Sequence, residues 1–190
     1  MSLVWSRPRV DIGLAGDVVT TRKVSFASQK EQVDYLRSVV NQYRGVYAIR
    51  ARARDIVFRQ RMCAPKDKRA QALAIGSWVQ DNITYVEELP ETFQTPTSTV
   101  AQGYGDCDDY VQLICSLLES IGIDSELVAL QWPAEDGEYF RHIYAVACFA
   151  EKGREVCLPL DATLGLSVYD LTDPIRIAQL AGRKLTVYRG

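Results

Sequence analysis

The spacing of apolar residues changes once along the chain, from a helical period in the first two thirds to alternation in the last third. Between Ser28 and Gly122, apolar residues recur every three or four positions, which is typical of amphipathic helices. After Gly122, apolar and polar residues alternate in short runs, which indicates strands. Helices followed by a β-meander predict an α+β domain, with N-terminal helices packed on a C-terminal antiparallel sheet.

The residues at the ends of these segments are typical of helix caps and turns. Ser28 and Glu31 form a capping box at the start of the first helix, and Gly122 ends the last helix. The expected helices cover residues 28–45, 46–62, a segment that opens at 65–67, and 107–122, and the expected strands cover 126–131, 139–150, 155–160 and 184–188. Residues 1–27 are expected to be extended, with one strand at most, and residues 90–96 to form a loop.

Length and charge restrict the architecture and the partners. A chain of 190 residues suits a single domain over 1–190, with an extended segment over 1–27 and a core over about 28–190. The net charge of -2 gives no basis for a nucleic acid or an anionic membrane as partner. The arginines between Arg50 and Arg61 would spread around more than one face of a helix, which favours a solvated surface over a phosphate track.

Neither a membrane span nor a secretory signal is evident in the sequence. No apolar run approaches the roughly 18 residues that a spanning helix needs. The first eight residues lack the basic stretch and the apolar core of a signal peptide. We therefore expect a cytoplasmic location and no membrane partner, and the oligomeric state is left open.

The chain contains five cysteines and one histidine, His142. The odd number of cysteines and the lack of a C-x-x-C pair argue against a disulfide framework. In the expected cytoplasmic setting we interpret all five as reduced thiols, although Cys148 and Cys157 could pair in an oxidising compartment. A zinc site made of His142 and cysteines lacks paired ligand spacing.

The carboxylates near residue 107 do not form a calcium site of the EF-hand type. Counted from Asp106, the sixth and twelfth positions of such a loop are Val111 and Leu117. An EF-hand needs glycine and glutamate at these positions. We therefore expect no metal and no cofactor.

Cys107 lies at the start of the most amphipathic of the expected helices. The stretch 103–106 contains two glycines, which allow a tight approach, and ends on Asp106, a good N-cap. Unpaired N–H groups and the positive end of the helix dipole favour a thiolate there and could hold an oxyanion. Asp108 and Asp109 in the first turn are expected to oppose the thiolate. A base is therefore required, and His142 is the candidate.

The expected hairpin brings that histidine to a carboxylate. Closing the turn on residues 152–153 makes Tyr144 face Asp161. His142 then projects from the same face of the sheet and is a diagonal neighbour of Asp161. If the start of the helix packs against that face, Cys107, His142 and Asp161 form a triad, in which His142 takes the thiol proton and Asp161 holds the other ring nitrogen.

Three short stretches carry these residues: Gly-Asp-Cys-Asp-Asp-Tyr at 105–110, Arg-His-Ile-Tyr-Ala-Val at 141–146 and Leu-Asp-Ala-Thr at 160–163. In their order and spacing they resemble the Cys, His and Asp boxes of the transglutaminase-like superfamily. Residues 78–85 are similar to that family's helix before the Cys box, and residues 93–96 followed by 99–105 resemble bacterial and phage-associated members. The resemblance covers roughly residues 49–163.

The resemblance implies a papain-like α+β fold and thioester chemistry on amide or acyl groups, without a cofactor. The family includes transglutaminases, cysteine peptidases, deglycosylating amidases and catalytically inactive binding proteins. The sequence does not match the multi-domain arrangement or the calcium-binding inserts of animal transglutaminases, which argues against protein crosslinking. Papain relatives place an oxyanion-hole glutamine shortly before the nucleophile, and Gln102 lies nearby, either in that role or as a loop residue.

Three functions are compatible with this pattern. The favoured one is a thiol-dependent hydrolase, a cysteine peptidase or amidase that acts on a peptide or protein amide. The second is an acyltransferase of transglutaminase type, which shares every step up to the thioester. The third is a non-catalytic peptide-binding or phage-assembly module, whose function would survive the substitution Cys107→Ala.

Overall fold

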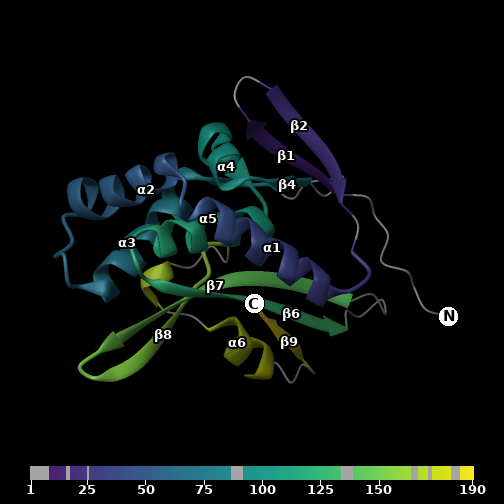
Figure 1. The fold of residues 1–190 in the computed structure, drawn as a ribbon. Helices are drawn as coiled ribbons and strands as arrows, with labels where there is room; N and C mark the ends of the chain where they lie inside the picture. The colour runs from purple at the N-terminus through teal and green to yellow at the C-terminus, as the bar shows by residue number, and fades with distance from the viewer. Residues whose placement is uncertain are drawn as a thin grey trace.

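The computed structural model describes residues 9–15, 18–24, 26–86, 92–133, 139–163, 167–170, 173–180 and 185–190. It is a mixed structure of helices and strands (Figure 1), in agreement with the predicted α+β class. The elements in chain order are β1 (Arg9–Ala15), β2 (Val18–Val24), α1 (Gln29–Tyr43), α2 (Tyr47–Arg54), the π-helix η1 (Asp55–Gln60), α3 (Lys68–Asn82), β3 (Thr84–Tyr85), β4 (Thr92–Gln94), α4 (Pro96–Gln102), β5 (Tyr104–Gly105), α5 (Cys107–Ser120), β6 (Asp124–Pro133), β7 (Tyr139–Glu151), β8 (Arg154–Leu160), the 3-10 helix η2 (Val168–Asp170), α6 (Pro174–Leu180) and β9 (Thr186–Arg189).

The main sheet has the strand order β8-β7-β6-β9, and every neighbouring pair is antiparallel. Strands β6, β7 and β8 form the predicted meander, and the last strand returns to the free side of β6. All four strands expected in the C-terminal part of the chain are therefore confirmed, with shifts of a few residues at their ends.

The hairpin between β7 and β8 has the predicted register. Glu151 faces Arg154, and the pairing continues to Ala145 opposite Leu160. Lys152 and Gly153 have φ angles of 50° and 76°. Two consecutive positive φ values are what a two-residue turn of type I′ requires, and its twist matches that of the flanking strands.

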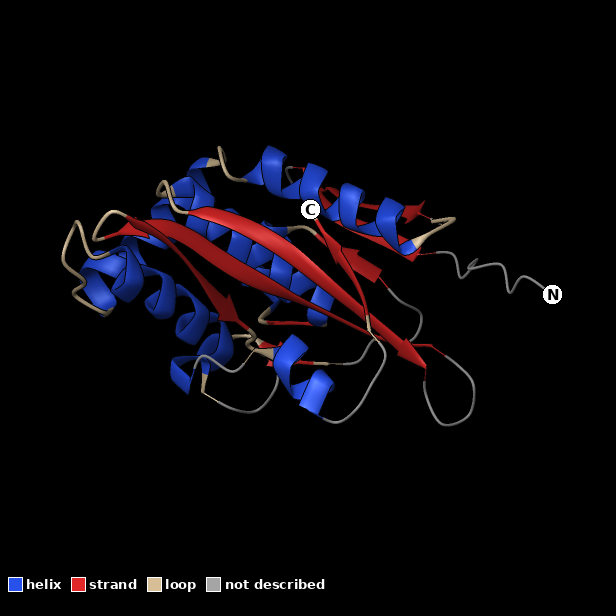
Figure 2. Cartoon of the chain, turned by 90° about the horizontal axis from the view of Figure 1, so that it is seen from below, coloured by secondary structure: helices blue, strands red, loops and turns tan. Residues whose placement is uncertain are grey.

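Helices cover one face of this sheet, and α6 lies on the other (Figures 1 and 2). Helix α5 packs on β6 and β7, and its residues Leu113 and Leu117 share the main core with Ile143 and Ala145. The alternate residues of β6 and β7 form a second apolar cluster, against which Ile175 of α6 packs. The sheet is therefore buried on both faces.

The helix boundaries agree with the capping signals of the sequence. Ser28 accepts a hydrogen bond from the amide of Glu31 at the start of α1, and Asp67 caps α3 in the same way. Gly122 follows α5 with a φ of +77°, as expected for the residue that ends a helix. Within the described ranges, no helix is long and apolar enough to cross a membrane.

Several short elements differ from the expectation. The N-terminal segment holds two strands, β1 and β2, which form a hairpin, rather than one strand at most. Part of the expected loop at 90–96 is strand β4, which pairs in parallel with β1, and residues 90–91 lie outside the described ranges. Helices α4 and α6 were not expected. Each has only seven residues, too few for a helical period to be recognised.

Candidate active site

Cys107 is the first residue of α5 and is half-buried. Asp106 is the N-cap, and its Oδ1 accepts hydrogen bonds from the amides of Asp108, at 3.0 Å, and Asp109, at 3.3 Å. The Asp109 side chain accepts in return from the amide of Asp106 at 3.3 Å, which completes a capping box. The expected position of Cys107 at a capped helix start is confirmed.

The cap restricts which groups can hold an oxyanion. The sequence suggested that the first-turn amides of the helix would bind it. In the structure the amides of Asp108 and Asp109 donate to Asp106 instead. An N–H group that already donates to a carboxylate offers little to a developing charge, so these two amides are not oxyanion donors.

Asp109 is fully buried and connects the helix start to its neighbours. Its Oδ1 accepts from the amide of Gln94, at the end of β4, at 2.8 Å. Burial, reinforced by the negative charge of Asp106, raises the pKa of Asp109 well above its ordinary value. A carboxyl group with a raised pKa carries less negative charge at a given pH. Asp109 therefore opposes a thiolate at Cys107 less than the sequence suggested.

Gly105 allows the buried carboxyl to lie against the backbone. A Cβ atom at this position would stand 2.8 Å from Cβ of Asp109 and 2.9 Å from its Oδ2. Only glycine leaves this space open, because contacts below 3.0 Å displace one of the two groups. The packing of Asp109 thus explains why a glycine stands at position 105, two residues before the cysteine.

His142 and Asp161 lie together at the other part of the site. Nε2 of His142 is 2.5 Å from Oδ2 of Asp161, and the Asp161 side chain is almost completely buried. The second oxygen, Oδ1, accepts from the amide of Thr163 at 3.0 Å and from its hydroxyl at 2.7 Å. With an ionised carboxylate, which only accepts hydrogen bonds, Nε2 is the ring nitrogen that donates in this contact. Nδ1 is then the ring nitrogen that can accept a proton.

Tyr144 is an aromatic neighbour of the histidine on the same strand. The rings of His142 and Tyr144 are stacked, with centroids 6.2 Å apart and planes 14° apart. The Tyr144 hydroxyl donates to Oδ1 of Asp173 at 3.4 Å, and burial followed by the charge of Asp173 raises the pKa of Tyr144. The hairpin register placed Tyr144 opposite Asp161, but neither Thr163 nor Tyr144 was given a role from the sequence. An Asp-x-Thr sequence at the end of a strand, typical of a side-chain turn, could have indicated Thr163.

The faces of β7 separate the histidine from the body of α5. Ile143 and Ala145 share the main core with the helix, whereas Tyr144 belongs to the second cluster. His142 alternates with Ile143 and stacks on Tyr144, so it projects from the face that α5 does not cover. The body of the helix therefore packs on the face of β7 opposite His142, whereas the expectation from the sequence placed only the start of the helix against the face of His142.

The candidate oxyanion-hole residue and the acidic loop lie outside the helix start and the hairpin that carry Cys107, His142 and Asp161. Gln102 is exposed at the last residue of α4. The acidic loop before β7 falls on residues 134–138, which lie outside the described ranges. Among the described residues, no group of three or more His, Cys, Asp or Glu side chains is arranged to hold a metal ion.

The cysteines differ from the expectation of five thiols. Cys148 and Cys157 face one another across the hairpin and form a disulfide. The interpretation as reduced thiols is wrong for this pair, because directly facing positions on adjacent strands bring the two sulfurs within bonding reach. Cys115 is completely buried, which raises its pKa to about 12, and burial also raises the pKa of Cys63. A raised pKa lowers the fraction of thiolate, which is the nucleophilic form of cysteine.

A family comparison covers this part of the chain. Residues 57–154, just over half of the sequence, match the core of the transglutaminase-like superfamily. The matched range includes Cys107 and His142 and ends before Asp161. No curated protein matches the sequence significantly.

The solved structures that match this chain are distant from it in sequence. A protein from Parabacteroides distasonis described as a "putative protease" has a TM-score of 0.51 at 14% identity, over 84% of this chain and 37% of its own. A "putative cysteine protease" from Cytophaga hutchinsonii has a TM-score of 0.39 at 16% identity, over 87% and 51%. LapG from Legionella pneumophila has a TM-score of 0.39 at 14% identity, over 67% and 72%. This chain therefore spans only part of the length of the first two proteins.

Proposed function

Because the chain belongs to the transglutaminase-like superfamily, we propose that it is a thiol-dependent hydrolase of amide bonds in a peptide or protein. Cys107 is the nucleophile, His142 the base and Asp161 the residue that orients the histidine. The observation that carries the proposal is the contact of 2.5 Å between Nε2 of His142 and Oδ2 of Asp161. A buried carboxylate that fixes one ring nitrogen of a histidine leaves the other ring nitrogen to act as the base for a thiol.

The first half of the reaction follows from these roles. His142 takes the proton of the Cys107 thiol on Nδ1, and the positive imidazolium is stabilised by Asp161. The thiolate attacks the carbonyl carbon of the amide, a C–S bond forms and the carbonyl oxygen becomes an oxyanion. The C–N bond then breaks, and His142 gives its proton to the leaving amine. The product of this half is a thioester on Cys107.

Water completes the reaction. His142 takes a proton from a water molecule, whose oxygen attacks the thioester carbon. The C–S bond breaks and the sulfur regains the proton from His142, which releases a carboxylic acid. No cofactor enters these steps. An amine in place of water would give acyl transfer through the same thioester, so analysis of the products distinguishes the two reactions.

Three exposed apolar side chains on or beside the strands that precede Cys107 support a substrate with an apolar side chain. Tyr85, Val86 and Tyr104, which we call the apolar ledge, are exposed by 47%, 40% and 39%. Strands β3 and β5 pair in parallel, with Tyr85 opposite Gly105, two residues before Cys107. The rings of Tyr85 and of Tyr110 on α5 form a T-shaped pair, with their centroids 5.9 Å apart. Tyr85 thus lies against α5, and Tyr104 precedes the nucleophile by three residues.

The disulfide affects the proposed setting. Disulfides persist in oxidising compartments and are rare in the cytosol. The cytoplasmic location expected from the sequence therefore does not form part of this proposal. The disulfide in the hairpin is more compatible with substrates in an oxidising compartment than with substrates in the cytosol.

The proposal is tested by the rate at which iodoacetamide alkylates Cys107 at different pH values, followed by peptide mass spectrometry. We expect Cys107 to react much faster than Cys63 and Cys115 below pH 7, because an imidazolium beside a thiol lowers its pKa. The variant His142→Ala should lose this advantage. If Cys107 reacts slowly at low pH in both proteins, no poised thiolate exists and the protein is not a thiol hydrolase.

A further inference from the structure

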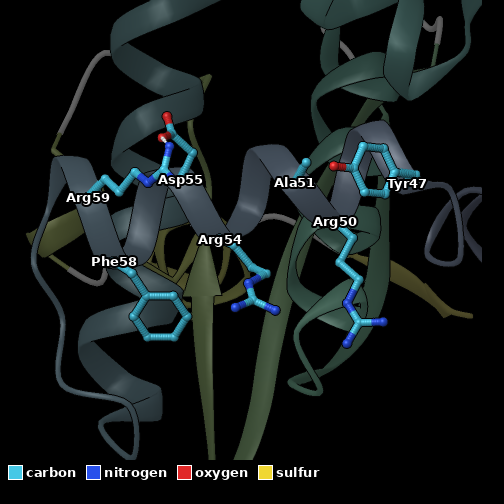
Figure 3. A pocket seen from close by; sticks show the side chains of 7 residues that line it. All are labelled: Tyr47, Arg50, Ala51, Arg54, Asp55, Phe58 and Arg59. Carbon is cyan, nitrogen blue, oxygen red and sulfur yellow. Dashed lines mark ion pairs between the residues drawn. The ribbon is translucent and has the colours of Figure 1, made fainter.

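The helix formed by α2 and η1 presents a hollow on its outer side, far in sequence from the residues proposed for catalysis. The hollow has a volume of about 650 Å³. Its lining residues all come from this helix (Figure 3): Tyr47, Arg50, Ala51, Arg54, Asp55, Phe58 and Arg59. We call this surface the arginine face.

Two arginines dominate the charge of the arginine face. Arg50 and Arg54 are four residues apart, so they lie one turn apart on the same side of the helix. Figure 3 shows both side chains extending to the same side as Phe58. Like charges at this spacing destabilise a helix. Neither guanidinium forms an ion pair with a carboxylate in the part of the chain that the structure describes.

The other arginines of this segment have partners. Arg52 lies over the ring of Trp78, with 5.3 Å between the guanidinium carbon and the ring centroid. Arg59 pairs with Asp55 at 3.7 Å, and Arg61 pairs with Asp81 at 2.6 Å. The expectation that the arginines spread over several faces is correct. Among the arginines between Arg50 and Arg61, the two without an ion pair or a ring contact to a described residue are therefore Arg50 and Arg54.

Exposed aromatic side chains stand at both ends of these arginines. Tyr47 is 85% exposed and Phe58 is 40% exposed. Phe58 lies in the π-helical turn, where the wider backbone changes the direction of the side chains, and such turns are frequent at functional sites. The negative charge of Asp55 is offset by Arg59 at 3.7 Å, and its carboxylate also accepts a hydrogen bond from Nε2 of Gln60 at 2.7 Å. The surface therefore combines positive charge with apolar area.

We propose that the arginine face is a docking surface for an acidic segment of a partner protein. The segment would carry two carboxylates about one helical turn apart, opposite Arg50 and Arg54, and an apolar residue further along that contacts Phe58. Carboxylates match guanidinium groups in charge and in geometry. A nucleic acid fits less well, because it needs a longer positive track than two arginines on a chain whose net charge is -2.

The test is a binding measurement with a defined probe. The probe is a fluorescein-labelled helical peptide with glutamates four residues apart and a leucine four residues further, and its anisotropy is followed as the protein is added. We expect saturable binding that weakens with salt. The double variant Arg50→Glu/Arg54→Glu should bind at least about tenfold more weakly. Phe58→Ala should weaken the leucine peptide more than a peptide with serine in that place.

A matched control separates the site from the overall charge. Arg154→Glu/Arg176→Glu changes the net charge equally at exposed positions on β8 and α6, and it should alter binding less than about twofold. Circular dichroism verifies that each variant is folded. Absence of saturable binding, or an equal loss in both double variants, would refute the proposal. Tighter binding of single-stranded DNA through the same two arginines would also refute it, in favour of a phosphate polymer.

Discussion

His142 and Asp161 form a closed unit in which every oxygen of the carboxylate is used. Oδ2 lies 2.5 Å from Nε2 of the histidine, and Oδ1 accepts two hydrogen bonds from Thr163. Thr163 thereby fixes the carboxylate, and the carboxylate fixes the imidazole. The orientation of the His142 ring therefore depends on Thr163, two positions beyond the aspartate.

This chain of contacts predicts the effect of Asp161→Asn. The amide keeps the shape of the carboxylate and loses its charge, so the imidazolium is no longer stabilised. We expect Cys107 alkylation by iodoacetamide below pH 7 to slow by about tenfold or more, since each unit of pKa changes the thiolate fraction tenfold. Thr163→Val removes one hydrogen bond of the carboxylate, and we expect it to slow Cys107 alkylation by about two- to fivefold. Unchanged alkylation in Asp161→Asn would show that Asp161 does not act on the base.

The parts of the fold that could be predicted from the sequence are those with long periodic patterns. Helices α1, α3 and α5 have apolar stripes and recognisable caps, and the hairpin between β7 and β8 is fixed by its turn at 152–153. The proximity of His142 and Asp161 followed from that register alone. Local chemistry and strand alternation were sufficient here, because the contact joins neighbouring strands.

The rest depends on tertiary contacts that a sequence does not reveal. Strands β3 and β5 have two residues each and exist through their mutual pairing. The face of β7 that α5 covers is set by packing of the whole sheet. The use of the first-turn amides by Asp106 follows from the capping box, whose geometry was only partly considered in the sequence analysis. The state of Cys148 and Cys157 depends on the compartment as well as on their distance.

The contact between Gly105 and Asp109 predicts a pair of glycine substitutions with opposite effects. Gly105→Ala places a Cβ 2.8 Å from Cβ of Asp109, and this overpacking should lower the free energy of unfolding by about 1–3 kcal/mol. Gly45→Ala meets no atom within 4 Å. It should be neutral or stabilise by about 0.4–1 kcal/mol through the unfolded chain. Urea unfolding of both variants checks this, and equal effects would mean that Gly105 is not sterically restricted.

The raised pKa of Asp109 predicts that stability falls as the pH rises. The unfolded chain releases the proton of this carboxyl near pH 4, whereas the folded protein holds it to higher pH. Between the two pKa values the native state binds more protons, so the free energy of unfolding decreases with pH and levels off above the folded pKa. The difference in stability between wild type and Asp109→Asn should shrink over this window. Parallel urea curves from pH 4 to pH 8 would show that the pKa of Asp109 is not raised.

The disulfide between Cys148 and Cys157 predicts a response to reductant. Alkylation in denaturant should modify three cysteines in the oxidised protein and five after reduction. Because the bond closes a loop of about ten residues, reduction should lower the free energy of unfolding by about 2–3 kcal/mol. Cys148→Ala/Cys157→Ala should not respond, and Cys63→Ala should respond as wild type does. Five reactive thiols in unreduced protein would show that the bond is absent.

The apolar ledge predicts a preference that can be measured without the natural substrate. Two dipeptidyl fluoromethyl ketones, identical except for leucine or serine before the reactive group, alkylate Cys107 only after they bind. We expect the leucine compound to react faster, because an apolar side chain buried against Tyr104 leaves water. Tyr104→Ala should reduce this preference by about tenfold, while the iodoacetamide rate stays unchanged because that reagent is too small to use the ledge. Tyr169→Ala, at an exposed tyrosine in η2, is the matched control and should leave the preference intact. A preference that survives Tyr104→Ala would place the substrate elsewhere, even if Cys107 proves to be the nucleophile.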